Sequence, residues 1–263
     1  MDLLLQDKAA LVGGASKGIG RAIAKELLKE GARVMISSRS EENLQAAVEA
    51  LREETGKEAE WAVCDMTKVG DIKTLVAAAA AKFGRLDIVV NNAGGPPTGT
   101  FQDLDERYWH FAIDQNLLSV VRTVREALPH LMKSPAGRII NMTSVSVKQP
   151  IDGLILSNAT RLGVVGLAKT LSRELAPHGI TVNNVCPGNI ATERLMALIE
   201  ERAARQGQTL ADAVALEEGR VPMGFLGEAD DVANLVAFLA SGSARFITGT
   251  TIQVDGGSTT AVF

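Results

Sequence analysis

A glycine-rich turn near the start of the chain has the chemistry to hold a phosphate. An apolar run at 8–12 leads into Gly13-Gly14-Ala15-Ser16-Lys17-Gly18-Ile19-Gly20, and a helical pattern follows. The start of a helix directs free N–H groups and a partial positive charge at an anion, and glycines let the backbone approach a pyrophosphate closely. A tight turn alone could be structural, but the strand–turn–helix context predicts dinucleotide binding. The residues expected to contact the dinucleotide here are Gly14, Ser16, Lys17, Gly18, Ile19 and Gly20.

The end of the next apolar run, 33–37, bears on which dinucleotide is bound. An acidic side chain there would hydrogen-bond the ribose 2′-hydroxyl, whereas a basic one accommodates a 2′-phosphate. Ser38 stands where the acid would be, and Arg39 follows it with a planar guanidinium that suits phosphate. Lys17 in the glycine turn adds a second cation. We therefore favour NADP(H) over NAD(H) as cofactor; the alternative is that Arg39 is a solvated surface side chain.

Short apolar runs alternate with longer helical stretches along the chain. Repeated strand–helix–strand units with near-continuous apolar strands predict a parallel sheet with helices on both faces. The expected fold is α/β: a Rossmann-type, doubly wound, seven-stranded parallel sheet in a three-layer sandwich. Ligands of such sheets bind beyond the carboxyl ends of the strands. The expected strands are 8–12, 33–37, 60–64, 86–91, 137–142, 181–186 and 251–254, and the helical stretches include 19–30, 42–54, 71–83, 120–132 and 162–175.

Length and composition limit the classes of protein that this chain can belong to. The 263 residues, 46% of them hydrophobic, suit a single domain, 1–263, with one large core. The net charge of -4 leaves no broad basic surface for nucleic acid, and no run reaches the roughly 18 apolar residues of a membrane span. The opening MDLLLQDKAA is too short and too acidic for a signal peptide. We expect a soluble, cytoplasmic protein.

The remaining reactive side chains predict no further site. Cys64 and Cys186 lie in apolar runs and are expected to be reduced core thiols. The three histidines are scattered without ligand spacing, so no metal site is expected. The charged helical stretch 193–223 follows a strand end. It is interpreted as a lid over the site, with an extra surface helix pair as the alternative.

Further motifs follow the glycine turn in a recognisable order. Asn91-Asn92-Ala93-Gly94 follows the fourth strand, Asn141-Met142-Thr143-Ser144 ends the fifth, Pro187-Gly188 ends the sixth, and ITGTTIQVDGG lies near the end of the chain. With the glycine spacing G-x-x-x-G-x-G they resemble the short-chain dehydrogenase/reductase family over essentially the whole chain. Gly13 replaces a commoner threonine. The most similar branch is that of the 3-oxoacyl-(acyl-carrier-protein) reductases. Because the family assembles as dimers or tetramers, we expect a homo-oligomer.

The resemblance implies further contacts with the cofactor. Asp65, just after the third strand, would accept a hydrogen bond from the adenine amine; the alternative is that it only caps the next helix. The segment after the fourth strand would form the floor of the cofactor site beside the adenosine ribose. The segment after the sixth strand would hold the nicotinamide carboxamide and the pyrophosphate. The residues implied in these roles are Asp65, Met66, Asn92, Ala93, Gly94, Pro187, Gly188, Ile190 and Thr192.

The resemblance also implies a set of catalytic positions, and two of them carry unexpected residues. In the family, a tyrosine donates a proton, and a lysine four residues later lowers the phenol pKa and binds the nicotinamide ribose. A serine polarises the carbonyl, and an asparagine supports a water relay. Asn116 and Ser144 match the asparagine and the serine, although Ser144 could be a strand-end hydroxyl without a task. Ser157 stands at the tyrosine position and Arg161 at the lysine position.

These two replacements predict altered proton delivery. Residues four apart share a helix face, so Ser157 and Arg161 can face the same cofactor. Arg161 can hold ribose hydroxyls but, as a permanent cation, cannot relay a proton. An alcohol is a far weaker acid than a phenol, whose pKa is about 10, and a positioned general acid contributes about 10²–10⁴-fold. Turnover should be slow or use a substitute. Lys148 and Asp152 are candidate substitute proton donors, although each is more simply an ordinary loop charge. Tyr108 could reach the site only through an unusual helix position or from another subunit.

Three functions are compatible with these residues. The first is an NADP(H)-dependent oxidoreductase that interconverts a small-molecule ketone and secondary alcohol. We prefer it because everything that positions a nicotinamide remains. The second is a cofactor-binding protein without redox turnover, acting as a sensor or a partner subunit. The third is a lyase, ranked last because family relatives that eliminate halide keep the tyrosine and lose the dinucleotide glycines, the reverse of this chain.

Overall fold

Seven parallel strands form the centre of the protein within the residues that the structure describes. The structure is a computed structural model, and it describes residues 3–262. The strand order is β3-β2-β1-β4-β5-β6-β7, and every neighbouring pair is parallel. The order reverses between β1 and β4, where sheets of this kind bind their ligands. The strands are β1 (Ala9–Val12), β2 (Arg33–Ser38), β3 (Glu60–Val63), β4 (Ile88–Asn91), β5 (Arg138–Met142), β6 (Thr181–Pro187) and β7 (Thr251–Val254).

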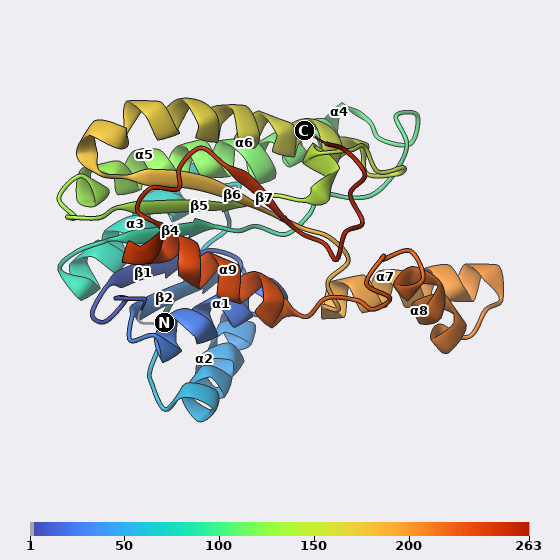
Figure 1. Ribbon diagram of the computed structural model, residues 1–263, viewed down its shortest axis with the longest axis horizontal. Coiled ribbons are helices and arrows are strands. Elements are labelled where there is room, and N and C mark those ends of the chain that lie inside the picture. Colours follow the sequence, from blue (N-terminus) through green and yellow to red (C-terminus); the bar gives the residue numbers. More distant parts are fainter. Residues whose placement is uncertain (1–2, 263) are drawn as a thin grey trace.

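Helices cover both faces of this sheet and complete a three-layer sandwich (Figure 1). On one face α1, α2 and α9 enclose an apolar core that includes Leu27 and Val236. On the other face α3, α5 and α6 enclose a second core that includes Leu75 and Val164. The predicted Rossmann-type fold is confirmed. The helices are α1 (Gly18–Lys29), α2 (Glu41–Thr55), α3 (Val69–Phe83), α4 (Glu106–Ala112), α5 (Ser119–Leu131), α6 (Ile155–Glu174), α7 (Glu193–Gln206), α8 (Leu210–Glu218) and α9 (Ala229–Ala240).

Two helical regions differ from the expectation. Helix α6 begins at Ile155, ahead of the apolar stretch 162–175, and it includes Ser157 and Arg161, for which a shared helix face was expected. Its first turns bury polar side chains that hide the apolar period; Ser157 and Thr160 are among them. Helix α4 lies outside the helical stretches named above. It continues through a π-helical segment, Ile113–Leu118, into α5. Both regions carry candidate catalytic residues.

A row of asparagine side chains crosses the buried middle of the sheet. Asn91, Asn141 and Asn184 are paired in register on β4, β5 and β6. The Asn91 amide donates to Asn141 at 2.8 Å, Asn141 donates to Asn184 at 3.0 Å, and Asn184 donates to Thr251 at 3.0 Å. An amide can donate and accept at once, so buried neighbours satisfy one another only when the strands are aligned. The row therefore favours the register that brings the carboxyl ends of β4, β5 and β6 together.

The segment 193–223 contains a helix pair, α7 and α8, that projects from the body beside the carboxyl edge of the sheet (Figure 1). It has a small apolar core of its own, built around Ile199, Ala203 and Ala213. The position and the separate core suit a lid. Its movement stays a prediction.

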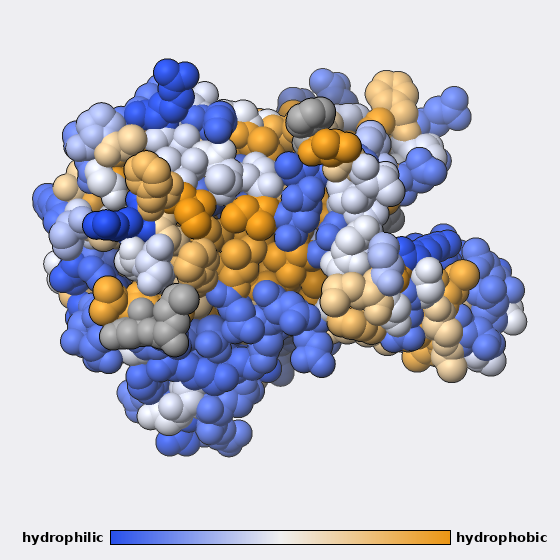
Figure 2. Space-filling model, in the orientation of Figure 1, coloured by the Kyte–Doolittle hydropathy of each residue, from blue (hydrophilic) through white to orange (hydrophobic). Residues whose placement is uncertain are grey.

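An apolar surface lies over the edge strand β7 and the neighbouring part of α9 (Figure 2). Ile252 and Val254 on β7 and Leu235 and Phe238 on α9 are only partly buried. An edge strand with apolar side chains is a common site of association. Self-association of the chain stays a prediction.

Asp87 joins three parts of the fold at the amino end of β4. Its side chain is fully buried and accepts hydrogen bonds from the Ala9 amide at 2.9 Å and the Ser134 hydroxyl at 2.5 Å. Arg85 adds two further bonds, at 2.8 and 2.6 Å. Burial raises the pKa of Asp87, but these donors outweigh burial and hold the pKa below its ordinary value of 3.8. The carboxylate therefore stabilises the fold in its charged form.

We expect Asp87→Asn to lower the free energy of unfolding at pH 7 by about 2–3 kcal/mol, because a neutral amide replaces a buried charged acceptor. The contribution of Asp87 is fully present above its unfolded pKa and is lost as the pH falls through the lowered folded pKa. The variant should therefore lose less stability than the wild type between pH 7 and pH 3, measured by urea unfolding. Glu49→Gln, which removes an exposed acid paired with Arg52, is the control. Equal acid sensitivity in Asp87→Asn and the wild type would contradict this account.

Candidate cofactor and active site

The glycine turn after β1 is packed tightly against the segment after β4. The Asn92 side-chain amide donates to the carbonyl oxygens of Gly13 and Gly14, each at 3.1 Å. A Cβ atom at Gly20 would lie 2.3 Å from the Gly14 carbonyl oxygen, and one at Gly13 would lie 2.7 Å from that of Asn92. Gly14 and Gly18 adopt left-handed backbone angles, with φ of 55° and 53°. Contact and backbone angle thus both require glycine here.

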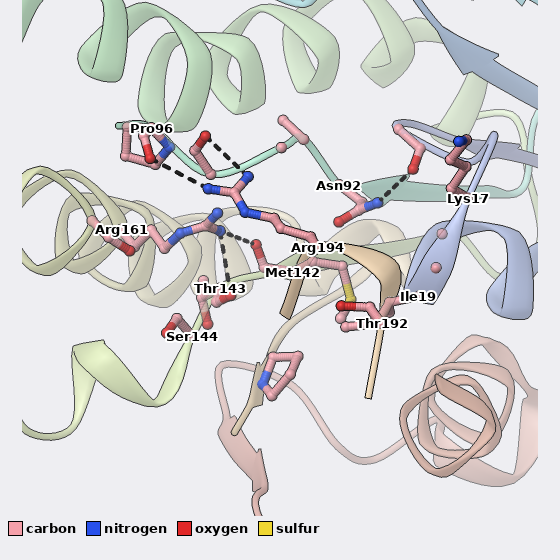
Figure 3. A pocket seen from close by; sticks show the side chains of 18 of the residues that line it. Lys17, Ile19, Asn92, Pro96, Met142, Thr143, Ser144, Arg161, Thr192 and Arg194 are labelled. Atoms are coloured by element: carbon pink, nitrogen blue, oxygen red, sulfur yellow. Dashed lines mark hydrogen bonds between the residues drawn. The ribbon is translucent and has the colours of Figure 1, made fainter. Parts of the chain in front are cut away.

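The turn presents the start of α1 to a large cavity. Lys17 precedes the helix and makes no side-chain cap, so the first helical N–H groups remain available to an anion. The cavity has a volume of about 660 Å³ and lies between the start of α1, the start of α7 and the carboxyl ends of β4, β5 and β6 (Figure 3). The predicted site residues that line it are Gly14, Lys17, Gly18, Ile19, Gly20, Asn92, Ala93, Gly94, Ser144, Ser157, Arg161, Pro187, Gly188 and Thr192.

A second cavity, of about 580 Å³, continues from the first on the other side of the glycine turn. Four residues, Gly14, Lys17, Ala93 and Gly94, line both cavities. The predicted residues that line only the second cavity are Ser16, Ser38, Arg39, Asp65 and Met66. Two halves that meet at free helix amides match the shape of a dinucleotide, whose pyrophosphate joins two nucleosides.

The polar groups of the second cavity suit the adenosine half of a dinucleotide. Asp65 accepts two hydrogen bonds from Thr67, at 3.0 and 2.8 Å, both on Oδ1. Burial raises the pKa of Asp65, but the Thr67 hydrogen bonds and the charges of Lys68 and Arg39 outweigh it and lower the pKa. Asp65 is therefore ionised and can accept a hydrogen bond from a ligand. Through its bonds with Thr67 it also stabilises the loop before α3. Arg39 is exposed at the rim of the cavity, and Ser38 donates to the Ser40 carbonyl instead of presenting an acid.

Lys17 is held differently from the expectation. Its ammonium group forms an ion pair at 3.1 Å with Glu193, at the start of α7. Both side chains are more than half exposed, so the pair is weak and a stronger anion can displace it. Lys17 reaches both cavities, but Arg39 is the more available cation at the end of β2.

Ser144 and Ser157 both line the large cavity and lie close to a third serine. Ser144 Oγ accepts a hydrogen bond from the Ser146 amide at 3.2 Å, and the hydroxyls of Ser146 and Ser157 are 3.4 Å apart. Ser157 is buried in the first turns of α6. Sequence reasoning missed Ser146, because it matches no motif and only the short 3-10 turn after β5 brings it to Ser157.

Arg161 lies one helical turn after Ser157 and points to the end of β5. Its Nη1 donates to the carbonyl oxygens of Met142 and Thr143, at 2.9 and 3.3 Å. Its remaining N–H groups face the cavity (Figure 3). Burial, and then the charge of Arg194, lowers the pKa of Arg161 to about 10. The guanidinium therefore remains charged at neutral pH, and the side chain serves as a fixed hydrogen-bond donor.

Asn116 lies behind Arg161 rather than in the large cavity. It sits in the π-helical segment, and its amide nitrogen donates to Thr160 at 2.9 Å. The side-chain oxygens of Asn116 and Asn91 are buried and have no hydrogen-bond partner within the described residues. Both residues, with Arg161, line a small cavity of about 10 Å³. This is about the size of one water molecule, so a water that donates to both oxygens would sit next to Arg161.

Arg194 is a site residue that the sequence analysis missed. It follows Thr192 by two positions and lies in the first turn of α7, where it lines the large cavity. Its guanidinium donates to the carbonyl oxygens of Gly95 and Pro96, at 3.2 and 3.4 Å. An arginine in a charged surface helix does not by itself indicate a binding site. Its short distance in the sequence from the Pro187-Gly188 motif could have identified it.

Some of the predicted residues lie elsewhere. The Ile190 side chain is buried in the core with α1 and α9, instead of lining the large cavity, because its segment turns inward at the bridge to Gly227. Of the candidate substitute proton donors, Lys148, Asp152 and Tyr108 line neither of the two large cavities. The charge of Lys148 acts instead on Cys186 in β6.

Two further observations concern the described residues as a whole. Within 3–262 no group of three or more His, Cys, Asp and Glu side chains could hold a metal ion. In the same residues no helix is long and apolar enough to cross a membrane. Cys64 and Cys186 are buried free thiols, and burial raises the pKa of Cys64 to about 12.

We expect Gly20→Ala to weaken NADPH binding by about tenfold or more, equivalent to about 1.4 kcal/mol. The added Cβ would meet the Gly14 carbonyl oxygen and push the turn away from the start of α1. Gly70→Ala in the first turn of α3 is the matched control, because a Cβ there meets nothing within 4 Å. The measurement is a fluorescence titration of NADPH. Equal dissociation constants for the two variants would show that the close packing does not govern binding.

Comparisons with known proteins agree with this architecture. A family model described as enoyl-(acyl carrier protein) reductase matches residues 14–259. The chain is 38% identical over 252 residues to the 3-oxoacyl-(acyl-carrier-protein) reductase FabG of Staphylococcus epidermidis, covering 95% of this chain and 98% of the relative.

Two solved structures are similar over their whole length. L-sorbose reductase of Gluconobacter frateurii, complexed with NADPH and L-sorbose, has a TM-score of 0.96 and 28% identity, with 100% of each chain covered. An NADPH-bound short-chain oxidoreductase of Pseudomonas aeruginosa PAO1, described as containing an atypical catalytic center, has a TM-score of 0.86 and 30% identity, covering 96% of this chain and 98% of that chain. The chain belongs to the short-chain dehydrogenase/reductase family of oxidoreductases.

Proposed function

We propose that this protein is an NADP(H)-dependent oxidoreductase that interconverts a small-molecule ketone and a secondary alcohol, with atypical proton delivery. The observation that carries the proposal is the pair of cavities joined at the glycine turn, one of which ends at Ser144, Ser157 and Arg161. Family membership and the 3-oxoacyl reductase relative support carbonyl reduction as the reaction class. Fold alone could not do so, because one fold hosts many functions.

The choice of NADP(H) rests on the end of β2. Ser38 offers no carboxylate to repel a 2′-phosphate, and the exposed guanidinium of Arg39 lies at the rim of the second cavity. Two similar structures contain NADPH. A guanidinium binds phosphate through charge-assisted hydrogen bonds, which are stronger than neutral ones.

In this mechanism, the polar groups that line the cavity bind the substrate carbonyl, orient the cofactor and stabilise the developing charge. When bound, the dihydronicotinamide supplies the hydride that reduces the carbonyl carbon. The Ser144 and Ser157 hydroxyls hydrogen-bond the carbonyl oxygen and stabilise its developing negative charge. Arg161, fixed by Met142 and Thr143, orients the ribose through its free N–H groups. Its positive charge also stabilises the developing alkoxide.

The proton reaches the alkoxide by another route than the phenol of the family. Serine is too weak an acid to deliver it unaided, and Arg161 does not give up its proton at neutral pH. We propose that water entering the cavity supplies the proton through the Ser157 hydroxyl, which lines the cavity and lies 3.4 Å from the buried Ser146 hydroxyl. Such a relay is slower than transfer from a positioned phenol.

A cofactor-binding protein without turnover is the second candidate function. Two observations favour it: Arg161 donates to two carbonyl oxygens, and the Ser157 hydroxyl lies within hydrogen-bond distance of Ser146. Tight NADPH binding without oxidation across a panel of ketones would support this second function. Reproducible turnover of one ketone would remove it.

We expect the double variant Ser157→Tyr, Arg161→Lys to raise the rate of NADPH oxidation with a ketone substrate by about 10²-fold. The phenol and the lysine together would supply the general acid that the wild type lacks. The measurement is kcat across a ketone panel, with NADPH affinity determined in the same samples. Tyr108→Phe is the control, because it removes an exposed tyrosine outside both large cavities. An unchanged or lower rate with intact NADPH binding would count against the assigned catalytic positions.

We expect Arg39→Ala to weaken NADPH binding by about 10- to 100-fold, the loss of a charged hydrogen-bond partner. NADH, which lacks the 2′-phosphate, should bind the variant and the wild type within about twofold of each other. Arg39→Lys should retain part of the NADPH affinity, because it keeps the charge and loses the planar fork. Equal losses of affinity for NADPH and NADH would mean that Arg39 does not bind the 2′-phosphate.

A further inference from the structure

Two guanidinium groups face the part of the large cavity that contains Ser144. Arg161 extends from α6, and Arg194 extends from α7 across the segment after β4 (Figure 3). A Cβ at Gly95 would lie 2.7 Å from Arg194 Nη2, so the glycine leaves room for the guanidinium to lie against the backbone. The two groups are close enough that the charge of Arg194 lowers the pKa of Arg161. The Arg194 guanidinium therefore has a fixed position against the backbone in this wall of the cavity.

The positive charge of these two groups is not compensated within the described residues. Neither arginine forms an ion pair there, and Glu193, the only acidic residue that lines the large cavity, is paired with Lys17. Both arginines bond only to neutral carbonyl oxygens, which leaves N–H groups on each for another acceptor. Arg161 is partly buried and Arg194 is exposed at the mouth of the cavity. Two such cations without a counter-charge repel each other, and an anion between them would relieve the repulsion.

The proposed cofactor does not account for this charge. Its pyrophosphate belongs at the free amides of α1, and its 2′-phosphate belongs at Arg39 in the second cavity. The nicotinamide ribose, which Arg161 is placed to hold, carries no charge. An anion at the arginine pair would therefore come with the substrate. This part of the lining also includes the apolar Pro96, Leu154 and Leu198 and the neutral hydroxyl of Thr98, so the arginine pair is its charged site.

We propose that the substrate is a keto acid or the corresponding hydroxy acid, whose carboxylate binds between Arg194 and Arg161 while its carbonyl lies at Ser144. The inference rests on the proposed oxidoreductase function and names the chemical class of its substrate. Arg194 is then a specificity-determining residue on α7, and the bound carboxylate joins α7 to α6 over the cavity. A neutral ketone of the same shape leaves the repulsion between the arginines in place.

The test uses binding rather than turnover. The wild-type protein is saturated with NADP⁺, which cannot reduce a ketone, and is titrated by calorimetry with 3-oxobutanoate, 4-oxopentanoate and the methyl ester of each. We expect at least one acid to bind about 10- to 100-fold more tightly than its ester, the range for a hydrogen-bonded charge. The difference should shrink as the salt concentration rises.

Variants of α7 then locate the effect. Arg194→Met should abolish the preference for the acid while leaving the dissociation constant of NADP⁺ within about twofold, and Arg194→Lys should retain part of the preference. Arg205→Met is the matched control: it removes an arginine from the same helix whose guanidinium pairs with Glu201 at the surface. This variant should bind acid and ester as the wild type does.

The outcomes separate the inference from the function on which it rests. Equal binding of acids and esters to the NADP⁺ complex would overturn the keto-acid proposal and leave the oxidoreductase proposal standing. So would a loss of NADP⁺ affinity in Arg194→Met equal to its loss of acid affinity, since Arg194 would then serve the cofactor. Failure of the wild type to bind NADP⁺ at all would overturn the proposed function itself.

Discussion

The close contact between the glycine turn and the segment after β4 is the constraint on which the rest of the site depends. Asn92 holds the carbonyl oxygens of Gly13 and Gly14, and Gly20 lies so near Gly14 that no side chain fits between them. The contact occurs where the strand order reverses, between β1 and β4. It orients the free amides of α1 toward the junction of two cavities. Without it, the cavities would have no common anion site.

Around this junction, charge is distributed along the carboxyl edge of the sheet. Arg39 lies at the outer end of this edge, and the free N–H groups of α1 lie in the middle. Arg161 and Arg194 lie at the inner end. The chain as a whole is acidic, with a net charge of -4, so this row of positive groups is local. A cleft of one sign of charge concentrates an anionic ligand. The arrangement suits a cofactor with three phosphates and, in our proposal, a substrate with a carboxylate.

In our proposal, the reaction centre lies between the end of β5 and the first turns of α6. Ser157 and Arg161 occupy one face of α6, one turn apart, as a proton donor and its helper would. Yet neither can act as an acid near neutral pH. Arg161 is anchored to the end of β5, and Ser157 pairs with Ser146. In the proposed mechanism, the site therefore stabilises charge well and transfers protons poorly, which would make turnover slow or dependent on solvent.

The sequence by itself determined the α/β class, the strand positions, the glycine turn and the family, because apolar periodicity and glycine spacing are local signals. It also located most residues that line the two cavities, since most of these follow a strand end and the family spacing indicated Ser157 and Arg161. Only the tertiary structure decided that Ser146 meets Ser157, that Ile190 turns into the core, and that Arg194 faces Arg161. Each of these depends on how α6, α7 and the segments after the strands pack against one another. Such packing joins residues far apart in the chain, so no local pattern encodes it.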